Sequence, residues 1–361
     1  MFKEIVADHR PWVGSTASEI GYAGLESQTA LHTYAHTDGS TYDVLVIDGR
    51  QNGEGRTILK STSLDYRINP FLIRQETINA TKLGARMAIA EIPGMSGIPL
   101  DSHGNLDLSI DIDEKMSTVR QTKQEFLQVR RGAFDLLAQK QLTAFIDILN
   151  LSEYDPVEIG GHSLGATMAA TMGRVAAKEQ LSIPLTIDRI HLDDPSNFFG
   201  LSAIDIAQNI NDGRKETKRR NEVYFKENEQ IGHGDITAFE RLSAETARIS
   251  KYIKGQQKSV VLNCLQATRW GIQPILSEFI EEGMKNGTVT PETVVSIAHY
   301  KDSLASKISA ARALHDIILS SGIRSQIFEY ISASDDPTEL GHQTLASLGR
   351  AASIAIDTPQ S

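Results

Sequence analysis

Residues 157–170, VEIGGHSLGATMAA, decide how this chain folds. A strand-like run is followed by the glycine-rich turn GHSLG at 161–165, and then by small residues that let a helix pack closely. A serine at the centre of so tight a turn needs strained backbone geometry. Glycines two residues on either side avoid collisions with the neighbouring strand and helix. The pattern predicts a strand, a sharp turn carrying Ser163, and a helix whose N-terminus lies beside that serine.

Strand and helix signals alternate on both sides of this turn. The expected strands are two runs flanking an Asp-Gly turn at 37–40, then 57–61, 86–92, 157–160, 187–192, 293–298 and 326–331. The expected helices between them are 70–83, 117–149, a helix from 165 onward, and one ending near 320. Such alternation predicts an α/β fold with a mostly parallel sheet and helices on both faces.

The alternation is interrupted in the middle of the chain. From about 197 to 289 the periodicity is helical, with a charged stretch in place of strand signals. We therefore expect one α/β core formed by residues 1–196 and 290–361, with residues 197–289 inserted as a helical cap.

The composition excludes several classes of partner. A net charge of −10 and a balanced hydrophobic fraction of 40% argue against nucleic acid and for a buried globular core. Cys264 is the only cysteine, so no intrachain disulfide can form. Residues 1–14 lack the apolar run of a secretory signal, and no apolar stretch is long enough to span a membrane. We expect a cytoplasmic protein without an integral membrane segment.

Three stretches together resemble the α/β-hydrolase family, and the resemblance covers roughly residues 28–196 and 290–361. The first is the GHSLG turn, the second is VVSIAHYKDSLAS at 294–306, and the third is IFEYISASDDPTELGHQTL at 327–345. In that family a catalytic triad runs in the chain order nucleophile, acid, histidine. The resemblance implies Ser163 as nucleophile, Asp302 as acid and His342 as base.

Alternative roles exist for these residues. Asp302 and His342 would each also suit a helix cap, and Asp193 or Asp194, after the strand at 187–192, would also suit the acid position. His162 is unsuited to be the base, because its side chain leaves the turn in a different direction from that of Ser163.

The resemblance also implies an oxyanion hole. Its first donor would be the backbone N–H of Leu164, directly after the nucleophile. The second would come from the loop at 61–65, with Ser63 or Leu64 as donor. The His-Gly pair usual in the family is absent from this loop.

The predicted chemistry is hydrolysis of a small-molecule or lipid-like carboxylic ester or thioester through an acyl-enzyme, with no cofactor and no metal. The acidic stretch 101–114 does not have the ligand spacing of a calcium loop, and no histidine pair has the spacing of a zinc protease. The same triad would also suit a peptidase or a C–C bond hydrolase. A binding protein that retains the fold without catalysis is a further alternative.

Overall fold

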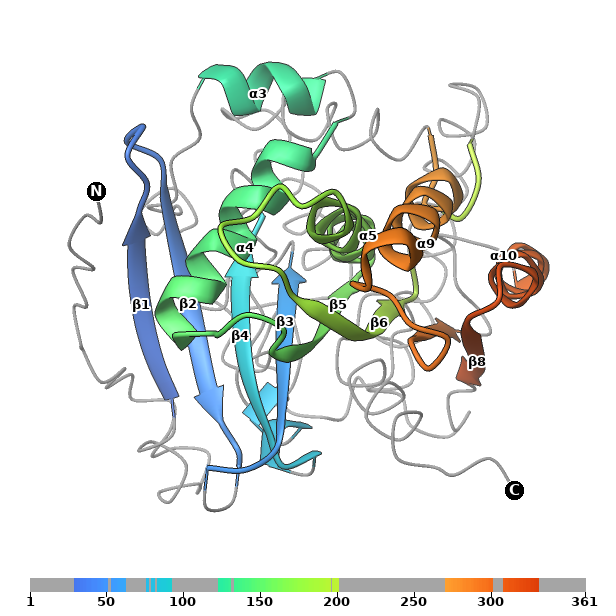
Figure 1. Cartoon of the computed structure of the whole chain (residues 1–361), viewed down its shortest axis with the longest axis horizontal. Coiled ribbons are helices and arrows are strands. Elements are labelled where there is room, and N and C mark those ends of the chain that lie inside the picture. The colour runs from blue at the N-terminus through green and yellow to red at the C-terminus, as the bar shows by residue number, and fades with distance from the viewer. Residues whose placement is uncertain are drawn as a thin grey trace, which may run out of the picture.

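The computed structural model describes residues 29–50, 53–62, 76–77, 79–81, 83–92, 123–130, 133–195, 197–200, 270–300 and 308–330. These residues form one eight-stranded sheet whose spatial order is β1-β2-β4-β3-β5-β6-β7-β8 (Figure 1). The strands are β1 Thr29–Ala35, β2 Thr41–Asp48, β3 Arg56–Thr62, β4 Ala85–Glu91, β5 Pro156–His162, β6 Thr186–Asp193, β7 Val294–Tyr300 and β8 Arg324–Tyr330.

The sheet is parallel except at one strand. β2 pairs antiparallel with both β1 and β4, whereas every pair from β4 through β8 is parallel. The β1–β2 connection is the expected hairpin, in which Gly39 adopts φ 86° and its N–H donates to the His36 carbonyl over 3.0 Å. The mostly parallel sheet predicted from the sequence is confirmed.

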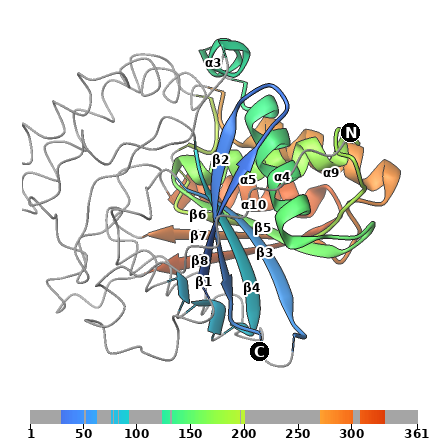
Figure 2. The same ribbon diagram turned by 90° about the vertical axis from the view of Figure 1, so that its left-hand side faces the viewer.

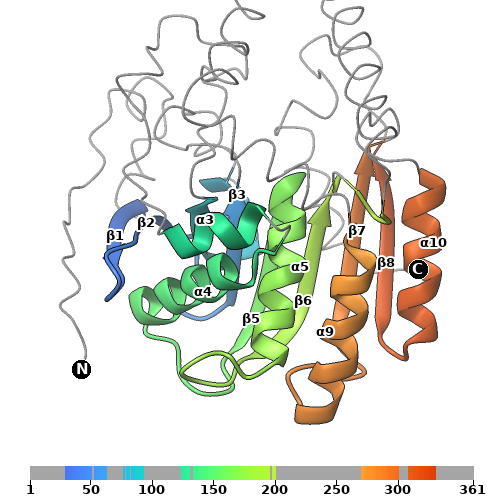
Figure 3. The same ribbon diagram turned by 90° about the horizontal axis from the view of Figure 1, so that it is seen from above.

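Helices cover both faces, as expected. The described helices are α3 Lys123–Arg130, α4 Asp135–Leu149, α5 Leu164–Ala177, α9 Gln273–Asn286 and α10 Ile308–Ser320. Figures 2 and 3 show α4, α5 and α9 on the same side of the sheet. Helical residues between 76 and 83 lie on the other side, where Ala80 packs with Ile58 and Met87 in a smaller buried cluster.

The larger buried cluster fixes α5 against the centre of the sheet. Nearly every residue of α5 is buried, which its run of small side chains allows. A Cβ atom added at Gly173 would lie 2.7 Å from Ile190 of β6 and 3.1 Å from Phe279 of α9. The glycine therefore permits close packing of α5 between β6 and α9. This packing holds the helix that begins beside Ser163.

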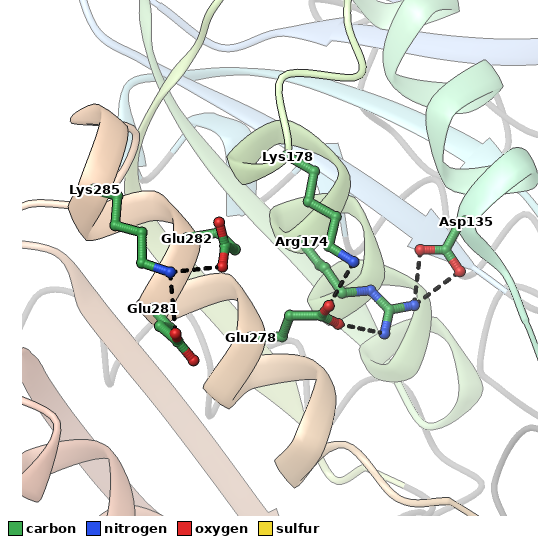
Figure 4. Close-up of polar contacts among 7 residues, drawn as sticks. All are labelled: Asp135, Arg174, Lys178, Glu278, Glu281, Glu282 and Lys285. Carbon is green, nitrogen blue, oxygen red and sulfur yellow. Dashed lines mark hydrogen bonds and ion pairs between the residues drawn. The ribbon is translucent and has the colours of Figure 1, made fainter.

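Helix α9 belongs to this same layer, although the sequence analysis placed residues 273–286 in the cap. Besides packing on α5, it is joined to it by ion pairs (Figure 4). Glu278 of α9 accepts from Lys178 at 2.5 Å and from Arg174 at 3.3 Å, and Arg174 also contacts Asp135 of α4 at 2.8 Å. Residues 201–269 lie outside the described residues, so the cap itself stays a prediction.

Across the described ranges, no helix combines the length and the apolar character that crossing a membrane requires.

Candidate active site

Four neighbouring parallel strands end at one edge of the sheet, in the order β3, β5, β6 and β7. Ser163 directly follows β5, and Asp194 directly follows β6. In the sequence, Asp302 comes two residues after β7, while Ser63 and Leu64 come directly after β3. The strand ends that precede all these residues therefore meet at one edge, which is where ligands bind in open α/β sheets.

The turn between β5 and α5 has the strained geometry predicted for it. Ser163 adopts φ 54° and ψ −115°, a backbone conformation that is rare outside glycine. Its N–H donates to the Asp193 carbonyl at the end of β6, over 2.9 Å. The neighbouring strand thus holds the serine in this conformation.

The two glycines of the turn are needed for steric reasons that the structure makes explicit. A Cβ atom at Gly161 would lie 2.0 Å from the Gly165 carbonyl oxygen, and one at Gly165 would lie 2.3 Å from the Ser61 carbonyl oxygen. Both contacts are with backbone, which cannot swing aside as a side chain could. Any larger residue at either position would displace the serine or the first turn of α5.

Helix α5 starts directly after the serine, at Leu164. The first N–H groups of a helix precede its regular hydrogen bonds, and the helix dipole adds partial positive charge there. In α5 the Ala166 N–H donates to the Ser163 carbonyl over 3.1 Å. The backbone at Leu164 is therefore suited to donate to an anion that forms beside Ser163.

These features identify the fold. A serine on a strained strand-to-helix turn, at the carboxyl edge of a mostly parallel sheet with helices on both faces, is the arrangement typical of one superfamily. The chain has an α/β-hydrolase fold.

Solved structures with this fold are similar to the chain at low sequence identity. A homoserine O-acetyltransferase from Bacillus anthracis is 11% identical with a TM-score of 0.49, covering 92% of this chain and 98% of that one. A Pyrococcus furiosus esterase is 10% identical with a TM-score of 0.44, covering 91% and 89%. A lipase/esterase from Lactobacillus plantarum is 12% identical with a TM-score of 0.40, covering 86% and 91%. No protein-family model matches the chain, and no curated protein matches it significantly.

The structure places only part of the predicted site. Ser163 and Leu164 lie together at the start of α5. Asp302, His342, Ser63 and Leu64 lie outside the described residues, so their roles stay predictions. Among the described residues, no three His, Cys, Asp or Glu side chains group together as a metal site requires.

Asp194, the alternative acid, has an unusual conformation at this edge. It is fully buried, its φ is 39°, and its N–H donates to the Ala298 carbonyl of β7 over 2.7 Å. A positive φ at a residue other than glycine indicates a conformation imposed by its surroundings. The backbone of Asp194 therefore ties the end of β6 to β7.

A buried charged cluster lies on the sheet face opposite α5, and the sequence analysis did not identify it. Lys60 of β3 donates to Glu76 over 2.6 Å; the Glu76 side chain is buried and that of Lys60 is 15% exposed. Asp193 of β6 is also buried and interacts electrostatically with both. The available signal was Lys60 in the strand-like run TILKS at 57–61, because the alternation of strand residues places it on the same face as the apolar Ile58.

Burial raises the pKa of the Asp193 carboxyl to about 7, with the charges of Glu76 and Asp194 acting in the same direction. The positive charge of Lys60 opposes this change. Burial by itself would lower the pKa of Lys60, but Glu76 and Asp193 hold that pKa above its usual value. The protein therefore keeps Lys60 charged and tends to keep Asp193 neutral below neutral pH.

Substituting Asp193→Asn is expected to change how stability depends on pH. The unfolded chain loses the Asp193 proton with the ordinary pKa of 3.8, whereas the folded protein keeps it to about 7. Since the folded protein binds more protons between these values, the free energy of unfolding of the wild type falls as pH rises through this window. The free energy of unfolding of the variant, relative to that of wild type, should therefore rise by roughly 2 to 3 kcal/mol from pH 5 to pH 8.

Urea unfolding of both proteins at the two pH values measures this gain. Asp316→Asn, at an exposed aspartate on α10, is the matched control for the substitution itself. If the free energy of unfolding changes with pH equally in wild type and Asp193→Asn, Asp193 ionises normally in the folded protein.

A second charged group on this face lies further from the edge. Glu158 of β5 accepts from His191 of β6 over 2.6 Å and from Nε and Nη2 of Arg56 of β3. Burial would raise the pKa of Glu158, but His191 and Arg56 hold it at about 2. The ionised Glu158 therefore links three adjacent strands. His191 takes part in this link on the sheet face opposite α5.

Proposed function

We propose that the chain is a serine hydrolase that cleaves a carboxylic ester or thioester through an acyl-enzyme. The observation that carries the proposal is the strained backbone of Ser163 between β5 and α5. That turn presents a hydroxyl at the carboxyl edge of the sheet, next to the backbone N–H of Leu164, which opens a helix. Acyl transfer requires these two features side by side, a nucleophile and donors for the oxyanion.

Each remaining role follows from the chemistry of the serine. A free serine hydroxyl is a weak nucleophile, so a base must accept its proton and later return that proton to the leaving group. We assign this base to His342. Asp302 would hold the imidazole in the correct tautomer and stabilise its protonated form. The Leu164 N–H, together with an N–H from Ser63 or Leu64, would bind the oxyanion.

The substrate would be a small-molecule or lipid-like ester, admitted under a helical cap formed within 197–289. A cap of this kind would exclude water and limit substrate size. The bond specificity would follow from the walls of the pocket more than from the triad.

Two assays test the proposal on the intact chain. A fluorophosphonate probe should label Ser163 covalently, with the labelled peptide identified by mass spectrometry. Nitrophenyl esters of increasing acyl length should be hydrolysed with a burst of nitrophenol, because the acyl-enzyme accumulates before it is hydrolysed.

The assays also separate the alternatives. Faster cleavage of aminoacyl anilides than of any ester would move the assignment to a peptidase. Labelling without turnover of esters or anilides would direct the search to C–C bonds, and absence of both labelling and turnover would favour a binding protein.

A further inference from the structure

Helix α4 carries a fully buried amide in an apolar environment. Gln141 has no exposed surface and lies among core residues of the same helix, namely Leu137, Ala138, Leu142, Ala144 and Phe145. A buried amide costs free energy unless its donor and its acceptor are both hydrogen-bonded. The partners of Gln141 therefore define what it does.

The amide joins the ends of two strands. Its Nε2 donates to the carbonyl of Glu91, the last residue of β4, over 2.9 Å. Its Oε1 accepts from the hydroxyl of Ser61, near the end of β3, over 3.0 Å. Both polar atoms of the amide are thus hydrogen-bonded. Through them the side chain fixes β3 and β4 to α4 near the carboxyl edge of the sheet.

Ser61 is also in contact with the turn that carries the candidate nucleophile. It pairs with Gly161 in the β3–β5 register. Its carbonyl oxygen approaches Gly165 so closely that a Cβ there would lie 2.3 Å away. Ser61 therefore touches both glycines of the turn, and a shift of Ser61 would be transmitted to the first turn of α5.

We propose that Gln141 is a positioning residue for the oxyanion hole. By holding Ser61, it fixes the first turn of α5, and with it the Leu164 N–H, relative to the end of β3, from which the second donor would come. The inference rests on the proposed function, because it assigns Gln141 a role in that same reaction. Catalysis of this type is sensitive to displacements of about 1 Å, so a small shift of one donor lowers the rate more than it weakens substrate binding.

The test compares variants that remove each end of the bridge. Gln141→Leu preserves approximate volume and removes both hydrogen bonds, whereas Ser61→Ala removes only the bond to β3. Each should lower kcat for a short nitrophenyl ester roughly 10- to 100-fold and leave KM within about twofold. The rate of fluorophosphonate labelling should fall by a similar factor, because that reaction also develops charge on an oxygen in the hole.

The double variant distinguishes positioning from stability. Gln141→Leu alone leaves the Ser61 hydroxyl buried without its partner, which destabilises the fold, and adding Ser61→Ala removes that unpaired group. We expect the double variant to regain part of the stability lost in Gln141→Leu but to keep the low kcat. Gln139→Leu is the matched control, since Gln139 lies on the same helix and donates to the Gln180 carbonyl, away from β3. Its kcat should equal that of wild type.

A wild-type kcat in folded Gln141→Leu would overturn the inference. A kcat that recovers together with stability in the double variant would also overturn it. If Gln141→Leu fails to fold, a wild-type kcat in Ser61→Ala has the same meaning. A wild type that neither hydrolyses esters nor reacts with the probe would instead overturn the proposed function, and this inference with it.

Discussion

Substituting Ser163→Ala abolishes ester hydrolysis and leaves the free energy of unfolding nearly unchanged. This is the largest effect that we expect. The substitution removes only the Oγ atom, and the turn is formed by backbone contacts: the Ser163 N–H on the Asp193 carbonyl, and two glycines that no side chain could replace. The Ser163 hydroxyl is the group that would be acylated, so without it no acyl-enzyme can form on this turn.

The measurement is steady-state hydrolysis of a short nitrophenyl ester, with unfolding by urea run on the same preparations. Ser152→Ala, at an exposed serine in the loop before β5, controls for the substitution and should retain full activity. Activity above a few per cent of wild type in Ser163→Ala, with contamination excluded, would assign the nucleophile to another residue.

Substituting Asp302→Asn should lower the acylation rate by a factor on the order of 1000 or more, as loss of the orienting carboxylate does in other triads. The reason is that an amide cannot accept the imidazole N–H as a carboxylate does, so the base would adopt the wrong tautomer. We expect a much smaller effect from Asp194→Asn. The position of Asp194 is set by its backbone bond to β7, which the substitution does not alter.

The burst phase of nitrophenol release measures acylation separately from deacylation, so it should be recorded for both aspartate variants. Far-ultraviolet circular dichroism of each variant confirms that it is folded. If Asp194→Asn is the slower of the two folded variants, the acid belongs at the end of β6 and Asp302 is a helix cap.

The features of the site that could be predicted from the sequence are those set by neighbouring residues. The strained serine and its two glycines lie within five residues. Gly161 is required by a backbone contact within the turn, whereas Gly165 is required by the Ser61 carbonyl of the neighbouring strand β3. The alternation of strands and helices is equally local, because it reflects the side-chain periods of 2 and 3.6 within each element. Both predictions were therefore confirmed without knowledge of the tertiary structure.

Other features depend on contacts between distant segments, so they could not be predicted from the sequence. Gln141 is 80 residues from Ser61, so nothing near it in the sequence indicates its partner. The cluster of Lys60, Glu76 and Asp193 is formed only when the tertiary fold brings β3, β6 and the helical residue Glu76 together. The assignment of 273–286 to the cap has a similar cause, since helical periodicity does not show whether a helix covers α5 or a pocket.

The pairing of β6 with β7 has a consequence for synthesis of the protein. Strands β1 to β6 lie within residues 29–193. The second neighbour of β6 in the sheet is β7, which begins only at residue 294. At a ribosomal rate of roughly 5–20 residues per second, about 100 residues take roughly 5–20 s to emerge. During that interval β6 has an unpaired edge in the nascent chain, next to the strand that carries Ser163, and such edges template association with other chains. Chaperone protection of the partly made chain would matter most in that interval.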